Sequence, residues 1–137
     1  MKFMIVVKAS ADSEAGIMPP QSLFLEMAEY HEALQKAGVL VDANGLKPTS
    51  QGFRVQYEGD KRTVVDGPFA ETKELIAGYT IIDVASRDEA VAWARKFPNP
   101  QGPGKTTYIE VRPFFELDDF EPGEGIERFR ELDARVR

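Results

Sequence analysis

The stretch "IAGYTIIDVASRDEAVAWARKFP", Ile76 to Pro98, places a strand and a helix in direct succession. Its first nine residues are apolar at positions that would face both sides of an extended chain, which predicts a buried strand. Ser86 stands at the N-cap position of the following helix and Glu89 at the capping-box position. Pro98 marks the end of that helix. This β-α unit predicts a helix packed on a sheet.

The rest of the chain supplies further elements in an order that predicts the fold. Apolar residues recur at helical spacing from Gln21 to Ala37, between a candidate N-cap at Ser22 and a stop at Gly38. We expect strands or extended pieces at residues 2–8, 39–41, 53–58, 62–65, 76–84 and 106–114. With the hairpin of residues 53–65 counted as one unit, the order is β-α-β-β-β-α-β, or β-α-β-β-α-β if residues 39–41 are not counted, which predicts an α+β protein with a ferredoxin-like split βαβ arrangement. An antiparallel sheet would then carry two helices on one face.

The apolar residues on the second face of this sheet must also be buried. Two helices cover one face only, yet Phe3, Tyr57, Tyr79 and Ile81 indicate apolar residues on both faces of several strands. A large exposed apolar face is unusual in a soluble monomer. We therefore expect a homodimer in which two sheets pack face to face.

Alternation along the last strand separates its two faces. Thr107, Ile109 and Val111 would face the helices, and Tyr108, Glu110 and Arg112 would face the open side, where Arg54 is a further candidate. Charged side chains in such a place must pair or meet a polar ligand. Two interpretations stay open: a Glu–Arg network at the dimer interface, or a ligand site that also includes Tyr79.

Composition excludes several classes of protein. The 137 residues suit one domain. A net charge of −6 argues against nucleic acid and anionic membranes as partners, because both attract clustered Lys and Arg. The absence of cysteine and the single histidine, His31, leave no spacing typical of a metal site, so we expect no metal and no cofactor. The apolar run near the N-terminus is too short for a signal peptide or a membrane span, which predicts a cytoplasmic protein.

The segment "DGPFAETKE", Asp66 to Glu74, combines a turn with alternating charges. Asp, Gly and Pro each favour a turn for their own reasons, so Asp66 can cap the turn while Phe69 packs into the core. Alternatively, Asp66 lies at the mouth of a cleft, where partial burial would make it a general base. Glu71 and Lys73 would then bind substrate, or else form a solvated charged turn.

The same segment resembles the signature of the DGPF-domain proteins within the YCII-related family. Further similarity lies in "HEALQKAGVLVDANGLKP" (31–48), in "GYTIIDVASRDEAVAWARKFP" (78–98) and in "IEVRPF" (109–114). The resemblance covers residues 1–115 and implies the dimeric α+β barrel fold. Residues 116–137 form a C-terminal extension outside it, with one charged helix predicted at about residues 124–136.

The resemblance implies three alternative functions. They are a small-molecule enzyme, a metabolite-binding protein with its pocket between sheet and dimer partner, and a non-catalytic module that binds an extracytoplasmic-function sigma factor. In the wider family a His–Asp dyad is the proposed catalytic pair, but its His position falls near Met27 in this chain, one turn before His31. Asp66 and His31 are the catalytic candidates. The substrate-binding candidates are Arg54, Phe69, Glu71, Lys73, Tyr79, Glu110 and Arg112.

Overall fold

A computed structural model describes residues 1–70 and 74–136 of the chain. The elements, in chain order, are β1 (Lys2–Lys8), α1 (Ala11–Glu14), α2 (Gln21–Lys36), β2 (Leu40–Gly45), η1 (Thr49–Gln51), β3 (Phe53–Glu58), β4 (Lys61–Asp66), β5 (Ile76–Asp83), α3 (Arg87–Arg95), β6 (Ile109–Pro113), η2 (Leu117–Asp119) and α4 (Glu124–Val136). The predicted helices and strands are therefore present.

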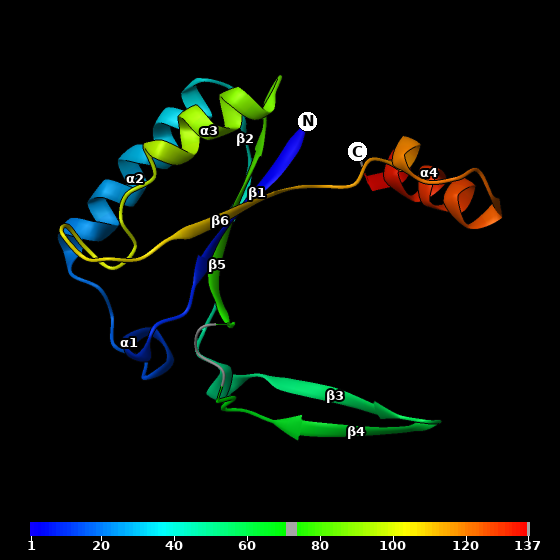
Figure 1. Cartoon of the computed structure of the whole chain (residues 1–137), viewed down its shortest axis with the longest axis horizontal. Helices are drawn as coiled ribbons and strands as arrows, with labels where there is room; N and C mark the ends of the chain where they lie inside the picture. The colour runs from blue at the N-terminus through cyan, green and yellow to red at the C-terminus, as the bar shows by residue number, and fades with distance from the viewer. Residues whose placement is uncertain (71–73, 137) are drawn as a thin grey trace.

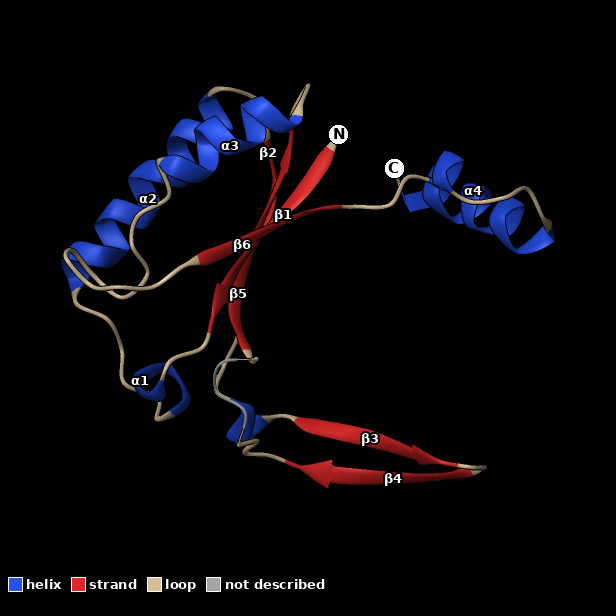
Figure 2. Cartoon of the chain, in the orientation of Figure 1, coloured by secondary structure: helices blue, strands red, loops and turns tan. Residues whose placement is uncertain are grey.

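Four strands form one antiparallel sheet in the order β2-β5-β1-β6. Helices α2 and α3 both lie on one face of it (Figure 1). The α+β class, the antiparallel sheet and the placement of both helices are confirmed. Strands β3 and β4 form a separate two-stranded hairpin, which projects from one end of the sheet (Figure 2).

The core lies between the sheet and these two helices. Ile5 of β1, Leu34 of α2 and Ile82 of β5 are fully buried at its centre. The Tyr30 hydroxyl of α2 donates a hydrogen bond to the Trp93 carbonyl of α3 at 2.8 Å, which ties the two helices together. Burying apolar side chains of this size contributes about 1.5–3 kcal/mol each, so this layer holds the domain together.

Three local predictions need correction. The extended piece predicted at residues 39–41 is a six-residue strand, β2, because Leu40, Asp42, Ala43, Asn44 and Gly45 all find partners on β5. The N-cap of α2 is Pro20, not Ser22. The sequence "SADSEAGIMPP" (10–20), which ends in two prolines, predicts a loop, but it contains the short helix α1, capped by Ser10. Ser86 does cap α3, accepting a hydrogen bond from the Glu89 backbone at 3.2 Å.

The Asp66–Phe69 turn anchors the hairpin to the rest of the chain. The Phe69 backbone N–H donates to Thr49 Oγ1 at 3.1 Å, and the Gly67 N–H donates to the Gly52 carbonyl at 3.0 Å. Thr49 in turn is bound through its backbone N–H and its hydroxyl to the Glu14 carboxylate. A Cβ on Gly67 would lie 1.8 Å from the Thr49 carbonyl oxygen, so only glycine fits there. The turn thus has a clear structural role.

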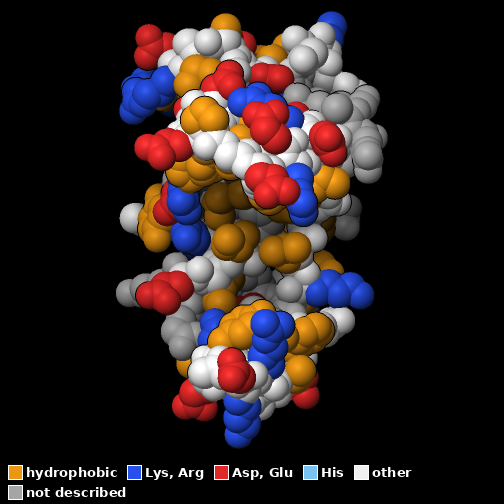
Figure 3. All heavy atoms as spheres, turned by 90° about the vertical axis from the view of Figure 1, so that its right-hand side faces the viewer, with side chains coloured by type: hydrophobic (Ala, Val, Ile, Leu, Met, Phe, Trp, Pro, Cys, Tyr) orange, Lys and Arg blue, Asp and Glu red, His pale blue; other side chains and the backbone are white. Residues whose placement is uncertain are grey.

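No described helix packs on the face of the sheet opposite α2 and α3, although Val6 at its centre is only 4% exposed, and we call it the open face. Phe3, Ile5 and Ile82 point to the helices, so the alternating side chains point the other way. Cross-strand pairing assigns these residues to the open face: Met4, Val6, Asp42, Asn44, Tyr79, Ile81, Glu110 and Arg112. Figure 3 looks onto this side and shows apolar side chains in a hollow between α4 and the hairpin.

The accessible surface is much larger than a compact monomer requires. The chain exposes 10272 Å², whereas a folded monomer of 15.3 kDa exposes roughly 7,100 Å². The excess is about 3,000 Å². The open face, the hairpin and the C-terminal arm (residues 114–133), which projects from the sheet, contribute to it.

Candidate functional site

Two rows of side chains cross the open face. In one row, Asn44 pairs with Tyr79, Tyr79 with Val6, and Val6 with Glu110, so the row runs through all four strands. In the next row, Asp42, Ile81, Met4 and Arg112 follow in the same order. Each row is polar at both sheet edges and apolar in the middle.

The β2 side of this face carries a hydrogen-bonded cluster. The Tyr79 hydroxyl donates to Asp42 Oδ2 at 2.9 Å and accepts from Asn44 Nδ2 at 3.1 Å. Asp42 Oδ1 also accepts from the Ala43 backbone at 2.9 Å and from Asn44 Nδ2 at 3.2 Å. The carboxylate is held in one orientation from three directions, and its Oδ2 atom keeps a lone pair for a further donor. We call Asp42, Asn44 and Tyr79 the β2 cluster.

The β6 side of the face carries cations. Lys8 Nζ lies 3.9 Å from Glu110 Oε1, and the Lys8 side chain is largely buried. Arg112 is exposed and makes no ion pair with another described residue. Its guanidinium is therefore available to a carboxylate or phosphate, which it binds in a bidentate fashion. In the order β2-β5-β1-β6, Tyr79 on β5 is two strand spacings from β6, about 10 Å, and Asp42 on β2 is three, about 14 Å, so a ligand that contacts both sides must span the face.

The predicted binding residues divide into two groups. Tyr79, Glu110 and Arg112 share the open face, as the alternation predicted for the last strand. Arg54 and Phe69 lie together at the base of the hairpin, where the Arg54 guanidinium is 3.8 Å from the centre of the Phe69 ring. Glu71 and Lys73 lie outside the described residues.

The two catalytic candidates lie far apart in the fold. Asp66 is the last residue of β4, exposed and paired with Phe53. His31 is on α2, on the helical side of the sheet. Its Nδ1 donates to the Met27 carbonyl at 2.7 Å, and its Nε2 lies 2.8 Å from Thr80 Oγ1. Nε2 joins α2 to β5 and Nδ1 bonds within α2, so both ring nitrogens are used and this arrangement gives His31 a structural role.

Sequence reasoning missed Asp42 and Asn44. The stretch "DANG" predicts a turn because it contains an Asn-Gly pair, whereas in the structure it is part of β2. Their spacing of two residues was the available signal, since alternate residues of a strand share a face. A register shift between Leu40 and Asp42 hid that signal, because it breaks the simple alternation of β2.

Other kinds of site find no support in the described residues. No group of three or more Asp, Glu or His side chains among them is placed to hold a metal ion. No described helix is long and apolar enough to cross a membrane.

Two comparisons with known proteins match most of the chain. Residues 1–115 match the YCII-related domain family. A protein of Rhizobium meliloti (strain 1021), described as uncharacterized, is 42% identical over 89 residues, which are 65% of this chain and 68% of that protein. The family match ends at residue 115. It therefore includes the open face and the hairpin but neither η2 nor α4.

Proposed function

The chain belongs to the YCII-related domain family, and on that premise we propose that it is a homodimer that binds a small molecule between the open faces of two copies. In this arrangement the two sheets pack face to face as a dimeric α+β barrel with a ferredoxin-like subunit. The observation that carries the proposal is the open face itself, which combines an apolar centre with ordered polar groups on both sides.

The apolar centre favours a protein cover over water. Met4, Val6 and Ile81 occupy neighbouring positions on β1 and β5, the two central strands. Stable homodimer interfaces bury roughly 2,000–5,000 Å² in total, or about 1,000–2,500 Å² on each partner, and the excess surface of the single chain, about 3,000 Å², is large enough to supply that. An isologous interface places the same residues of both copies around the twofold axis.

The polar groups indicate the class of ligand. The β2 cluster offers a carboxylate oxygen, which suits a hydroxyl or amino group. Arg112 offers a bidentate donor for an acid group. We therefore propose a small anionic metabolite with a hydroxyl or amino group and an apolar body, such as a hydroxy or amino acid derivative.

Binding is the function that this geometry supports best. Neither Asp66 nor His31 shares the open face with the β2 cluster, so a His–Asp catalytic pair has no support in their placement. An enzymatic role of the family type and a partnership with a sigma factor stay predictions from resemblance.

A thermal-shift screen tests the proposal on the whole chain. Hydroxy and amino carboxylates, phosphate esters and neutral analogues of the same size are compared, with light scattering to measure the molar mass. We expect a dimer, and a rise in melting temperature with an anionic ligand that Tyr79→Phe and Arg112→Gln each reduce. A monomer, or stabilisation by neutral analogues alone, contradicts the proposal.

A further inference from the structure

The hairpin has one apolar face with no partner among the described residues. The β3–β4 register places four apolar side chains on that face: Phe53, Val55, Tyr57 and Val64. Between 40% and 66% of each is exposed. A lone two-stranded hairpin is at best marginally stable in water, and this one is anchored only at its base. Its apolar face therefore needs a partner surface.

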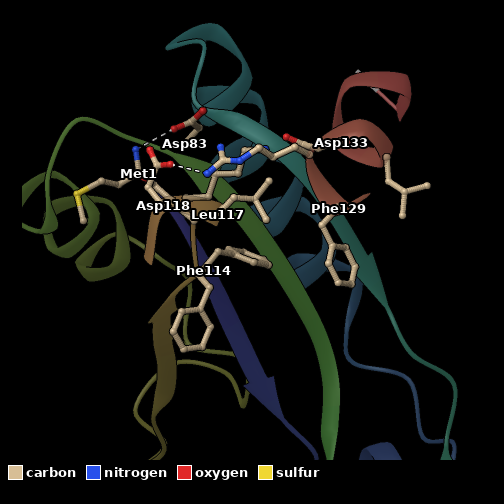
Figure 4. A pocket seen from close by; sticks show the side chains of 12 residues that line it. Met1, Asp83, Phe114, Leu117, Asp118, Phe129 and Asp133 are labelled. Carbon is tan, nitrogen blue, oxygen red and sulfur yellow. Dashed lines mark hydrogen bonds and ion pairs between the residues drawn. The ribbon is translucent and has the colours of Figure 1, made fainter. Parts of the chain in front are cut away.

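The C-terminal arm, residues 114–133, has an unfilled apolar groove. Phe129 and Leu132 project from α4 with 58% and 52% exposure, and they line a cavity of about 710 Å³ together with Phe114, Phe115 and Leu117. Figure 4 shows Phe114, Leu117 and Phe129 around this cavity, with the ion pair between Asp118 and Arg130 at 2.9 Å along one side. Helix α4 packs mainly on η2, and a 13-residue helix is marginal in isolation.

The hairpin and the arm flank the same open face from opposite ends. Figure 1 shows both projecting on the side of the sheet away from α2 and α3, with the central strands between them. A twofold operation that brings two open faces together can exchange these ends, so that the arm of one copy reaches the hairpin of the other. The alternative operation brings arm to arm and hairpin to hairpin.

Charge decides between the two arrangements. Residues 116–137 carry eight acidic and four basic side chains, so two arms in contact would repel each other. The hairpin, residues 53–66, carries three of each sign. Its apolar face also holds Arg62, stacked 4.9 Å from the centre of the Tyr57 ring, and Asp66 at the base of the hairpin. The groove is lined by the acids Asp83, Glu116, Asp118 and Asp133 and by the bases Lys2 and Arg130, of which Arg130 pairs with Asp118. Arg62 would meet these acids when the hairpin enters the groove.

We propose that the apolar face of each hairpin packs into the C-terminal groove of the second copy. This inference rests on the homodimer proposed above. Phe53, Val55, Tyr57 and Val64 cover Phe129 and Leu132 of the partner, and the contact occurs twice by symmetry. The C-terminal extension of each copy then contacts the hairpin of the other copy, at both ends of the dimer interface.

Single cysteines test this exchange directly, because the chain has none of its own. Full-length Val64→Cys and Leu132→Cys chains with different tags are co-expressed, and dimers that carry both tags are treated with a short bismaleimide. Matched controls are Thr63→Cys, on the opposite face of the hairpin, and Glu127→Cys, on the side of α4 away from Phe129 and Leu132. If Val64→Cys or Leu132→Cys does not fold, the pair Tyr57→Cys and Phe129→Cys replaces that pair in the same experiment.

We expect the Val64–Leu132 pair to form a two-tag crosslinked product at several times the yield of the control pair. In a chain that light scattering shows to be dimeric, each variant could instead crosslink only to a second copy of the same variant. That result overturns the contact between hairpin and arm of different copies but leaves the proposed dimer intact. Equal yields from both pairs in a dimer also overturn it. A monomeric mass overturns both proposals.

Discussion

The Tyr79 hydroxyl donates a hydrogen bond to Asp42 Oδ2 at 2.9 Å, which links β5 to the edge strand β2 on the open face. Neither residue contacts the helical core from this side of the sheet. A polar pair that holds an exposed carboxylate in one orientation is more useful for recognition than for stability, because exposed interactions of this kind contribute little to folding.

Removing this hydroxyl is therefore expected to separate binding from stability. Tyr79→Phe should lower the free energy of unfolding by about 1 kcal/mol or less, since the bond is solvent-exposed. The same variant should lose most of the stabilisation by an anionic ligand. Urea unfolding with and without ligand measures both quantities. A large loss of stability with unchanged ligand response would assign the pair to folding.

His31 should show the opposite behaviour. His31→Ala removes the bonds to the Met27 carbonyl and to Thr80, whose hydroxyl is buried. Leaving that hydroxyl unsatisfied, together with the lost bonds, should cost about 2–3 kcal/mol. Thr80→Val should reproduce part of the loss, and Thr80→Ser should not. Chemical denaturation measures the cost. Unchanged stability with lost activity or binding would restore His31 as a catalytic candidate.

The framework of the fold was predictable from local signals, whereas the functional surface was not. Ser86, Gly38 and Pro98 mark helix ends by their own backbone chemistry, so the helices could be placed without tertiary information. The β2 cluster depends on which residue of β2 faces Tyr79, and a register shift decides this. The sequence showed an apolar second face, but not that the hairpin leaves the sheet to form a separate arm.

Gly67 offers a sharp test of the structural role of the "DGPF" turn. Gly67→Ala would place a Cβ 1.8 Å from the Thr49 carbonyl oxygen, so the hairpin base must shift. We expect a loss of about 3 kcal/mol, at the upper end for overpacking. Gly45→Ala is the matched control, because a Cβ there meets nothing within 4 Å. Thermal unfolding compares the two. Equal melting temperatures would show that the turn does not depend on this close approach.

The raised pKa of Tyr30 predicts a loss of stability at high pH. Burial raises the pKa of Tyr30 from 10.0 to about 12. The folded chain thus holds this proton more tightly than the unfolded chain. Its contribution is fully present below pH 10 and is lost as the pH rises to about 12. The urea midpoint of unfolding of the native chain should fall across this pH window. The midpoint of the Tyr30→Phe variant should fall less. Parallel curves for both chains would show that other groups cause the fall.

A charge at the centre of the open face should break the dimer without unfolding the chain. In Ile81→Glu the new carboxylate lies between Met4 and Asp42 in the pairing register, and symmetry places it in the interface twice. An unpaired buried charge costs about 3–5 kcal/mol, which is enough to shift a micromolar dimer to monomer. Lys36→Glu, on the exposed side of α2, is the control for charge. Sedimentation velocity measures the mass, and circular dichroism checks the fold. A dimeric, folded Ile81→Glu chain would argue for an interface elsewhere, because Ile81 lies on β5, a central strand of the proposed interface.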